Sequence, residues 1–176
     1  YSAVSGNTGE WITNLVRNDY YPRDEIIEHN PKLLLDDYVK FIRYGEWRIN
    51  KSGQGVLAFI TNHGYLDNPT FRGMRQHLMQ TFDAIFVLDL HGNSKKKETA
   101  PDGSKDENIF DIQQGVAIFI GIKNRRDLLS CTVKQHDFWG LRSEKYLNLN
   151  SCKFHNILWK EIFPSRPFML FKNNQS

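Results

Sequence analysis

Two histidines in this chain of 176 residues stand where apolar segments end, a placement that brings polar chemistry to the edge of a sheet. His63 follows the apolar run 56–61, and His91 follows the run 84–90. Open α/β sheets bind their ligands at the carboxyl ends of their strands. Both histidines are therefore candidate site residues, with loop histidines of no chemical role as the alternative. His77 lies in a helical pattern, which favours a surface or packing role.

A run of three lysines, Lys95, Lys96 and Lys97, opens a long charged loop at residues 91–109. Long loops inside compact domains are usually functional or mobile. Lysines that follow the end of a strand can contact nucleic-acid phosphates, which makes binding salt-dependent without conferring sequence choice. A solvated face of the loop is the alternative interpretation.

Oxygen-bearing side chains alternate further along this loop, at Asp102, Ser104, Asp106 and Asn108. The alternation is similar to that of a calcium-binding loop. The turn glycine of the sixth position and the acidic residue of the twelfth are replaced by Glu107 and Gln113. We therefore expect a solvated loop here and no metal ion.

Composition excludes several classes of site and location. Cys131 and Cys152 lack the spacing of zinc ligands, and two thiols in a chain of this size fit a reducing cytosol better than a disulfide. The net charge of +3 permits contact with nucleic acid without requiring it. No apolar run approaches the roughly 20 residues of a membrane helix. We predict a cytoplasmic protein without a membrane segment.

Sequence signatures of complete catalytic sites are missing from the chain. It contains no glycine-rich phosphate loop, no G-x-S-x-G elbow and no H-E-x-x-H pair. Taken alone, these residues do not make a complete active site.

Apolar patterns predict an α/β fold whose elements position these candidates. Helical spacing marks residues 32–49 and 71–82, and continuous apolar runs mark strands buried on both faces at 56–61 and 84–90. This order predicts a βαβ crossover in a parallel sheet. The strand at 115–122 follows with no room for a helix, so we expect it to pair antiparallel and to end the sheet.

Residues 124–176 are predicted to be an extension or connector that leaves the sheet. Residues 130–137 have the pattern of one more strand, and residues 142–149 that of a weak helix. Aromatic residues crowd around Pro164 and Pro167 beyond them.

Five blocks of this sequence resemble a known family. They are Asp36–Ile49, Gly55–Leu66, Phe71–Arg75, Leu88–Ser94 and Asp106–Ile118. Together they resemble the adenine-N6 DNA methyltransferase domain of large single-chain restriction-modification enzymes, of the type ISP and related type IIG groups. The resemblance covers most of residues 1–123. It implies part of a Rossmann-like methyltransferase sheet with an antiparallel last strand, followed by a connector at 124–176 toward a target-recognition region.

The resemblance implies roles for two aromatic residues. Tyr1 matches the last residue of the family's catalytic Asn-Pro-Pro-Tyr motif, whose tyrosine ring stacks on the flipped adenine. Phe110 falls where the family places an aromatic on the other side of the base, although a phenylalanine packed at the start of a strand is the alternative. His63 and the three lysines remain candidate contacts to double-stranded DNA.

The family's cofactor is S-adenosylmethionine, but the turn and the acidic residue that bind it precede the tetrapeptide. They therefore lie outside this sequence, and we expect the chain alone neither to bind the cofactor well nor to methylate DNA. Its expected partners are DNA and the remaining modules of the same polypeptide, with a nuclease or helicase among the modules such enzymes carry. The alternatives are a non-catalytic DNA-binding or scaffold module of the same fold, and a methyltransferase that acts on RNA or protein.

Overall fold

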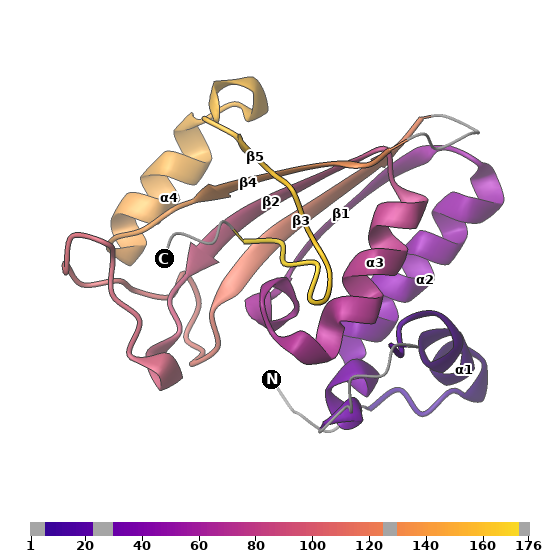
Figure 1. Cartoon of the computed structure of the whole chain (residues 1–176). Helices are drawn as coiled ribbons and strands as arrows, with labels where there is room; N and C mark the ends of the chain where they lie inside the picture. Colours follow the sequence, from indigo (N-terminus) through magenta and orange to yellow (C-terminus); the bar gives the residue numbers. More distant parts are fainter. Residues whose placement is uncertain (1–5, 23–29, 125–129, 173–176) are drawn as a thin grey trace.

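The computed structural model describes residues 6–22, 30–124 and 130–172. In these ranges the chain is an α/β fold of four α-helices and one open mixed sheet of five strands. Figure 1 shows α2 and α3 on one side of the sheet and α4 on the other. The helices are α1 (Glu10–Asp19), α2 (Asp37–Ser52), α3 (Arg72–Thr81) and α4 (Arg142–Ser151). The strands are β1 (Gly55–Asn62), β2 (Ala84–His91), β3 (Val116–Lys123), β4 (Thr132–Asp137) and β5 (Lys160–Ile162).

The strands are arranged in the order β1-β3-β2-β4-β5. β3 is antiparallel to both β1 and β2, so these two strands run parallel to each other on either side of it. The βαβ crossover through α3 and the antiparallel pairing of the third predicted strand are thus confirmed, but the predicted parallel sheet is a mixed one, because β3 separates β1 from β2. The expectation that this strand ends the sheet is wrong, because β3 lies inside it and satisfies the backbone groups of two neighbours.

Alternating side chains of the central strands supply two apolar cores on opposite faces. Ile85 and Val87 of β2 pack into the larger core, under α1, α2 and α3. Leu88 and Leu90 of the same strand pack into a smaller core, which the α4 residue Leu149 helps to cover. Since successive residues of a strand point to opposite faces, β2 is covered on both sides, as its continuous apolar run predicted.

β1 differs from the prediction of a strand buried on both faces. Its side chains alternate, with Leu57 and Phe59 partly buried toward α2, while Val56 and Ile60 on the other face are 61% and 43% exposed. The cause is that α4 covers the β2 side of that face and, among the described residues, nothing covers the β1 side. β1 is also an edge strand, paired on one side only within the described ranges.

The segment after residue 130 does not leave the sheet. β4 pairs parallel with β2, and β5 pairs antiparallel with β4, so both strands extend the sheet beyond the crossover. The predicted strand at 130–137 and the predicted helix at 142–149 are confirmed as β4 and α4. The prediction of a segment leaving the sheet is wrong because apolar residues such as Val133 and Ile162 join the larger core.

The helix before β1 ends near Gly53 as its sequence predicts, but it begins at Asp37 rather than at residue 32. α2 follows a 3-10 turn at Pro31–Leu35 and ends at Gly53, which takes the left-handed conformation with φ of 79°.

Cys131 and Cys152 are both free thiols. None of the helices in the described part of the chain is long and apolar enough to cross a membrane.

Candidate nucleic-acid interface

A mostly apolar groove of about 390 Å³ lies at the carboxyl end of β1. The start of α2, the last residues of β1 and the segment that leads into β3 form its walls. Its lining residues are Asp36, Asp37, Tyr38, Phe41, Phe59, Ile60, Thr61, Asn62, Phe110, Ile112, Gln114 and Val116. An apolar groove with a few polar groups at the carboxyl end of a sheet is a common form of binding site.

Phe110 is the candidate residue that lines this groove. The residue is 43% exposed, and its backbone N–H donates a hydrogen bond of 2.9 Å to Oδ1 of Asn108. The alternative of a core phenylalanine does not describe this position, because Phe110 precedes β3 in a loop and faces the groove. An exposed aromatic in a concave apolar site offers a flat surface on which a planar ligand can stack.

The first described residues of the chain lie next to the same groove. The backbone N–H groups of Gly6 and Asn7 donate hydrogen bonds of 3.0 and 3.2 Å to the two carboxylate oxygens of Asp37, which lines it. Tyr1, the other aromatic candidate, lies outside the described residues.

The three candidate lysines are exposed on a short turn at the same end of the sheet as the groove. Lys95 and Lys96 end the 3-10 turn Ser94–Lys96, and Lys97 follows in the left-handed conformation. The hydroxyl of Ser94 lies 3.5 Å from the carbonyl oxygen of Gln113, next in sequence to a groove residue. The turn therefore presents positive charge at the same end of the sheet as Phe110.

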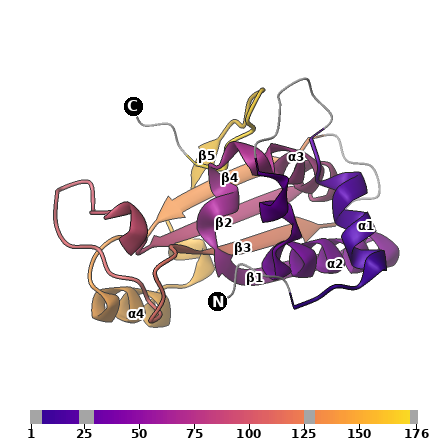
Figure 2. The ribbon, with the colours of Figure 1, turned by 90° about the horizontal axis from the view of Figure 1, so that it is seen from below.

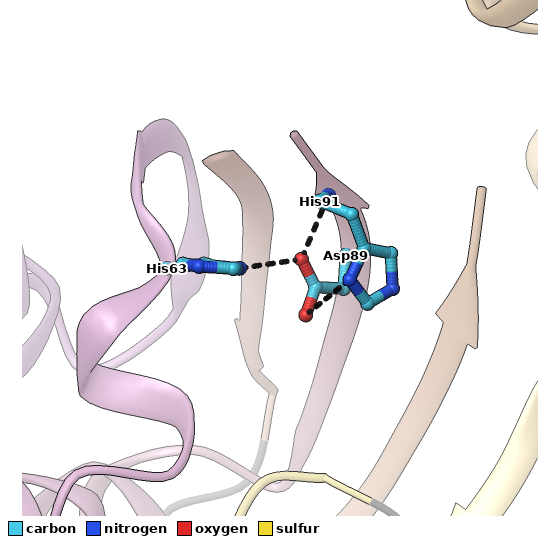
Figure 3. A group of neighbouring side chains, drawn as sticks. All are labelled: His63, Asp89 and His91. Carbon is cyan, nitrogen blue, oxygen red and sulfur yellow. Dashed lines mark hydrogen bonds and ion pairs between the residues drawn. The ribbon is translucent and has the colours of Figure 1, made fainter. Parts of the chain in front are cut away.

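His63 and His91 both lie at strand ends as predicted, and their side chains come together inside the protein. Both are 3% exposed, and their rings lie on either side of the buried carboxylate of Asp89 (Figure 3). Nδ1 of His63 is 2.9 Å from Oδ1 of Asp89, which also accepts the backbone N–H of His91 at 3.0 Å. A direct contact of His63 with DNA would require this network to open.

Carboxylates hold both ring nitrogens of His91. Nδ1 is 3.0 Å from Glu98, Nε2 is 2.7 Å from Asp137, and the ring stacks on Trp139 at 3.3 Å. Burial lowers the pKa of His91, but the hydrogen bonds to Asp137 and Glu98 and the nearby charge of Asp89 outweigh it and raise the pKa to about 9. His91 is therefore a buried imidazolium at neutral pH.

A metal ion suits this cluster poorly, although His63, Asp89 and His91 bring ligand atoms within 4.8 Å of one another. A histidine ligand needs an unprotonated nitrogen, whereas both nitrogens of His91 face carboxylates. Nζ of Lys172 already lies 3.1 Å from Oδ2 of Asp89. Burial raises the pKa of Asp89, but the hydrogen bond from His63 and the charges of His91 and Lys172 lower it well below its usual range. The cluster is a network of hydrogen bonds and ion pairs that fixes the ends of β1 and β2.

This network predicts a loss of stability at alkaline pH. The folded-state pKa of His91 lies above its ordinary value of 6.5. The stabilisation is thus fully present below about pH 6.5 and is lost as pH rises through about 9. We expect it to amount to about 3 kcal/mol. Urea unfolding of the chain between about pH 6 and pH 10 measures it.

The matched control is His91→Asn, because asparagine tolerates the positive φ of 52° at this position. The variant should be less stable at pH 7, and its unfolding free energy should change less between pH 7 and pH 10. Equal slopes for the two proteins would contradict the assignment of an imidazolium at His91.

The acidic loop between β2 and β3 is only partly solvated: Asp102 and Ser104 are exposed as expected, whereas Asp106 and Asn108 are held to the protein. Asp106 accepts hydrogen bonds from the backbone of Gly92 at 2.7 Å and of Gly140 at 3.0 Å, and its side chain pairs with Lys145 at 2.6 Å with both side chains fully buried. Asn108 is 8% exposed and donates to the carbonyl of Gly92 at 3.0 Å. These oxygens therefore serve the fold.

Gly92 permits this close approach. It has a φ of 82°, and a Cβ at this position would lie 2.3 Å from Cα of Asn108. Any side chain here would push the loop away from the strand end.

Sequence patterns did not identify Asp89, Glu98, Asp137, Lys145 or Lys172 as part of this region. The one local signal was Asp89, which lies two residues before His91 at the end of a strand. Alternate residues of a strand share a face, so the two side chains could be expected to meet. His77 takes the packing role expected of it, 2.8 Å from the buried Glu46.

No protein-family model matches this chain, and no curated protein matches it. Solved structures do. The DrdV–DNA complex matches with a TM-score of 0.75 and 25% identity over 94% of this chain. The ATP-dependent type ISP restriction-modification enzyme LlaBIII bound to DNA matches with a TM-score of 0.74 and 29% identity over 94% of the chain.

A nuclease-deletion mutant of the type ISP restriction-modification enzyme LlaGI, in complex with a DNA substrate mimic, shares the fold with a TM-score of 0.78 and 24% identity over 94% of the chain. The chain spans only 17%, 12% and 16% of the DrdV, LlaBIII and LlaGI chains. It resembles one segment of restriction-modification enzymes whose structures contain DNA.

Proposed function

We propose that this chain is the carboxyl-terminal half of the catalytic domain of a DNA adenine-N6 methyltransferase within a cytoplasmic restriction-modification enzyme. Residues 1–123 belong to that domain in this proposal, and residues 124–176, whose strands β4 and β5 extend the same sheet, lead on to a target-recognition region. The resemblance to segments of DrdV and LlaBIII, both solved with DNA, supports the assignment.

The observation that carries the proposal is the exposed ring of Phe110 in an apolar groove at the carboxyl end of β1. A base that an enzyme modifies must leave the duplex, and aromatic or apolar side chains then hold it by stacking. Phe110 and Phe59 line a groove of this character, and exposed lysines lie at the same end of the sheet. We therefore propose that the target adenine stacks on Phe110.

Tyr1 is proposed to stack on the other face of the adenine. Gly6 is hydrogen-bonded to the groove residue Asp37 at 3.0 Å. Five residues of extended chain span at most about 17 Å, so the covalent reach from Gly6 permits a contact between Tyr1 and a base in the groove.

The cofactor-binding half of the enzyme is proposed to cover β1. An unpaired strand edge is a site for pairing with another segment, and β1 also has the exposed apolar side chains Val56 and Ile60. The residues described here do not themselves fit S-adenosylmethionine. The groove is mostly apolar, and the oxygens of Asp37 are engaged by Gly6 and Asn7 rather than available to a ribose. We assign cofactor binding to the preceding part of the polypeptide.

Methyl transfer by the complete polypeptide that carries this chain tests the proposal. Incubation with tritium-labelled S-adenosylmethionine and unmethylated duplex DNA should label N6-methyladenine, and the 176-residue chain alone should label nothing. Label found only in RNA or protein acceptors would replace the proposal with a different methyltransferase. Tight stoichiometric cofactor binding by the isolated chain in calorimetry would contradict the division between two halves.

A non-catalytic DNA-binding or scaffold module is the second candidate, because three lysines are exposed at the same end of the sheet as the groove. The residues encoded before Tyr1 separate the two. An Asn-Pro-Pro sequence there favours the enzyme, and its absence favours the module.

Replacing Lys95, Lys96 and Lys97 by alanine should weaken DNA binding by the complete polypeptide. Each phosphate contact that is lost should reduce the slope of log affinity against log salt by about 0.9. Fluorescence anisotropy with a labelled duplex, over about 50 to 200 mM salt, measures both effects. Lys153→Ala, at an exposed lysine beyond α4, is the control and should leave the slope unchanged.

A further inference from the structure

Three side chains on one face of α4 contact the loop that carries Phe110. Arg142, Lys145 and Tyr146 lie three and four residues apart, so their side chains share one side of the helix. Figure 2 shows α4 beside the loop between β2 and β3, at the end of the sheet away from α1.

The side chain of Arg142 makes three contacts to this loop. Its Nε donates to the carbonyl of Asn108 at 2.7 Å and its Nη2 to the carbonyl of Phe110 at 3.2 Å, and its Nη1 pairs with Asp111 at 2.7 Å. A guanidinium is planar and rigid, so three such contacts fix a backbone segment in orientation as well as in position.

Two neighbours on the helix hold the rest of the segment. The hydroxyl of Tyr146 donates to the carbonyl of Ile109 at 2.7 Å. Nζ of Lys145 donates to the carbonyl of Glu107 at 2.7 Å and pairs with Asp106 at 2.6 Å. Every residue from Asp106 to Asp111 is thus bonded to one of three α4 side chains.

We propose that Arg142 and Tyr146 are positioning residues that hold Phe110 in the orientation in which it stacks on the target base. This inference rests on the proposed function. Phe110 and Asp111 are exposed, so without the clamp the Phe110 ring would sample several orientations, and stacking would require it to be ordered first. The clamp also connects the site to residues 124–176, the segment that contains α4.

The variants Arg142→Met and Tyr146→Phe remove the donors and keep most of the side-chain volume. The Arg142 side chain is 39% exposed and Tyr146 is 45% exposed, so neither change opens a cavity in the core. Arg48→Met is the matched control, because this exposed arginine lies on α2 with its guanidinium over the Trp47 ring.

Hydrogen-exchange mass spectrometry of the complete polypeptide is the structural readout. Peptides that cover residues 106–114 should take up deuterium faster in Arg142→Met and Tyr146→Phe, and at the original rate in Arg48→Met. Unchanged uptake in both test variants would overturn the clamp, whether or not the polypeptide methylates DNA.

Methyl transfer to unmethylated duplex DNA is the functional readout. We expect Arg142→Met to lower kcat roughly 10-fold to 100-fold, as misplacement of a group in a reactive site does, with the KM for S-adenosylmethionine unchanged. In a Phe110→Ala background the same change should cost less than about twofold, because both act through one ring. Equal losses with and without Phe110 would assign Arg142 a general structural role and overturn the proposal.

The two proposals fail in different ways. If Phe110→Ala leaves methyl transfer unchanged, or if the complete polypeptide transfers no methyl group to DNA, the proposed function fails and hydrogen exchange alone decides the clamp. If Phe110→Ala lowers activity and Arg142→Met does not, the proposed function stands and the positioning role of Arg142 is wrong.

Discussion

Phe110→Ala in the complete polypeptide should lower kcat/KM for DNA methylation about 5-fold to 150-fold. The range corresponds to the roughly 1–3 kcal/mol that stacking of one base on one aromatic contributes. Phe110 is 43% exposed and lines the groove, so the loss of its ring removes a contact surface for the base. Steady-state assays with a labelled methyl donor measure the change.

The loss should depend on the aromatic surface and not on the volume of the side chain. Phe110→Trp should retain most of the activity, because a larger ring still offers a face for stacking, whereas Phe110→Leu should resemble Phe110→Ala. Phe163→Ala is the matched control, since Phe163 is 83% exposed beyond β5 and does not line the groove. An equal loss of activity in Phe163→Ala would point to a nonspecific effect on the protein.

A fluorescent adenine analogue separates binding from base stacking. Duplex DNA with 2-aminopurine at the target adenine becomes brighter when the base leaves the helix, and stacking on a protein aromatic quenches it again. We expect Phe110→Ala to give a brighter complex than the original polypeptide, at similar affinity for DNA. Identical fluorescence in the two complexes would place the base away from Phe110.

Elements that depend on local pattern were predictable from the sequence. The helix before Gly53 and the buried strand β2 carry their own periodicity, and the lack of room for a helix before β3 predicted its antiparallel pairing. Long-range facts were not predictable in this way. An apolar run such as residues 56–61 predicts burial on both faces, but β1 is covered on one face only among the residues described.

The position of β3 inside the sheet was not predictable for the same reason. Its apolar run specifies a strand but not which neighbours it pairs with. Pairing with both β1 and β2 depends on the loop that follows Gly92, which brings the chain back between them. The direction of the loop is in turn set by side chains that are distant in sequence, among them Lys145, which donates to the carbonyl of Leu90 at 2.7 Å.

The candidate site was predictable to a similar extent. The family resemblance pointed to Phe110, which lines the groove. The strand-end rule pointed to His63 and His91, and the structure brings the two together inside the protein. Nothing in the sequence indicated Lys145, because a lysine in a weakly amphipathic helix is almost always exposed. Its burial follows from Asp106, which is 39 positions earlier (145 minus 106) and which the sequence pattern assigned to a solvated loop.

Lys145→Met should destabilise the 176-residue chain by about 3–5 kcal/mol, because it leaves the buried carboxylate of Asp106 without its cation. It also removes the donor to the carbonyls of Leu90 and Glu107. In a domain of this size each kcal/mol lowers Tm by about 2–4 °C, so we expect a fall of about 6–20 °C. Thermal unfolding followed by circular dichroism measures it, and Lys153→Met, at an exposed lysine, should change Tm little.

A second variant tests whether the stranded charge is the cause. Adding Asp106→Asn to Lys145→Met removes the uncompensated carboxylate, while the amide oxygen can still accept one of the two backbone N–H groups that Asp106 serves, those of Gly92 and Gly140. The double variant should therefore be more stable than Lys145→Met alone, although less stable than the original chain. If the double variant unfolds at a lower temperature than Lys145→Met, the cost lies in the lost hydrogen bonds, and the carboxylate is not the source of the instability.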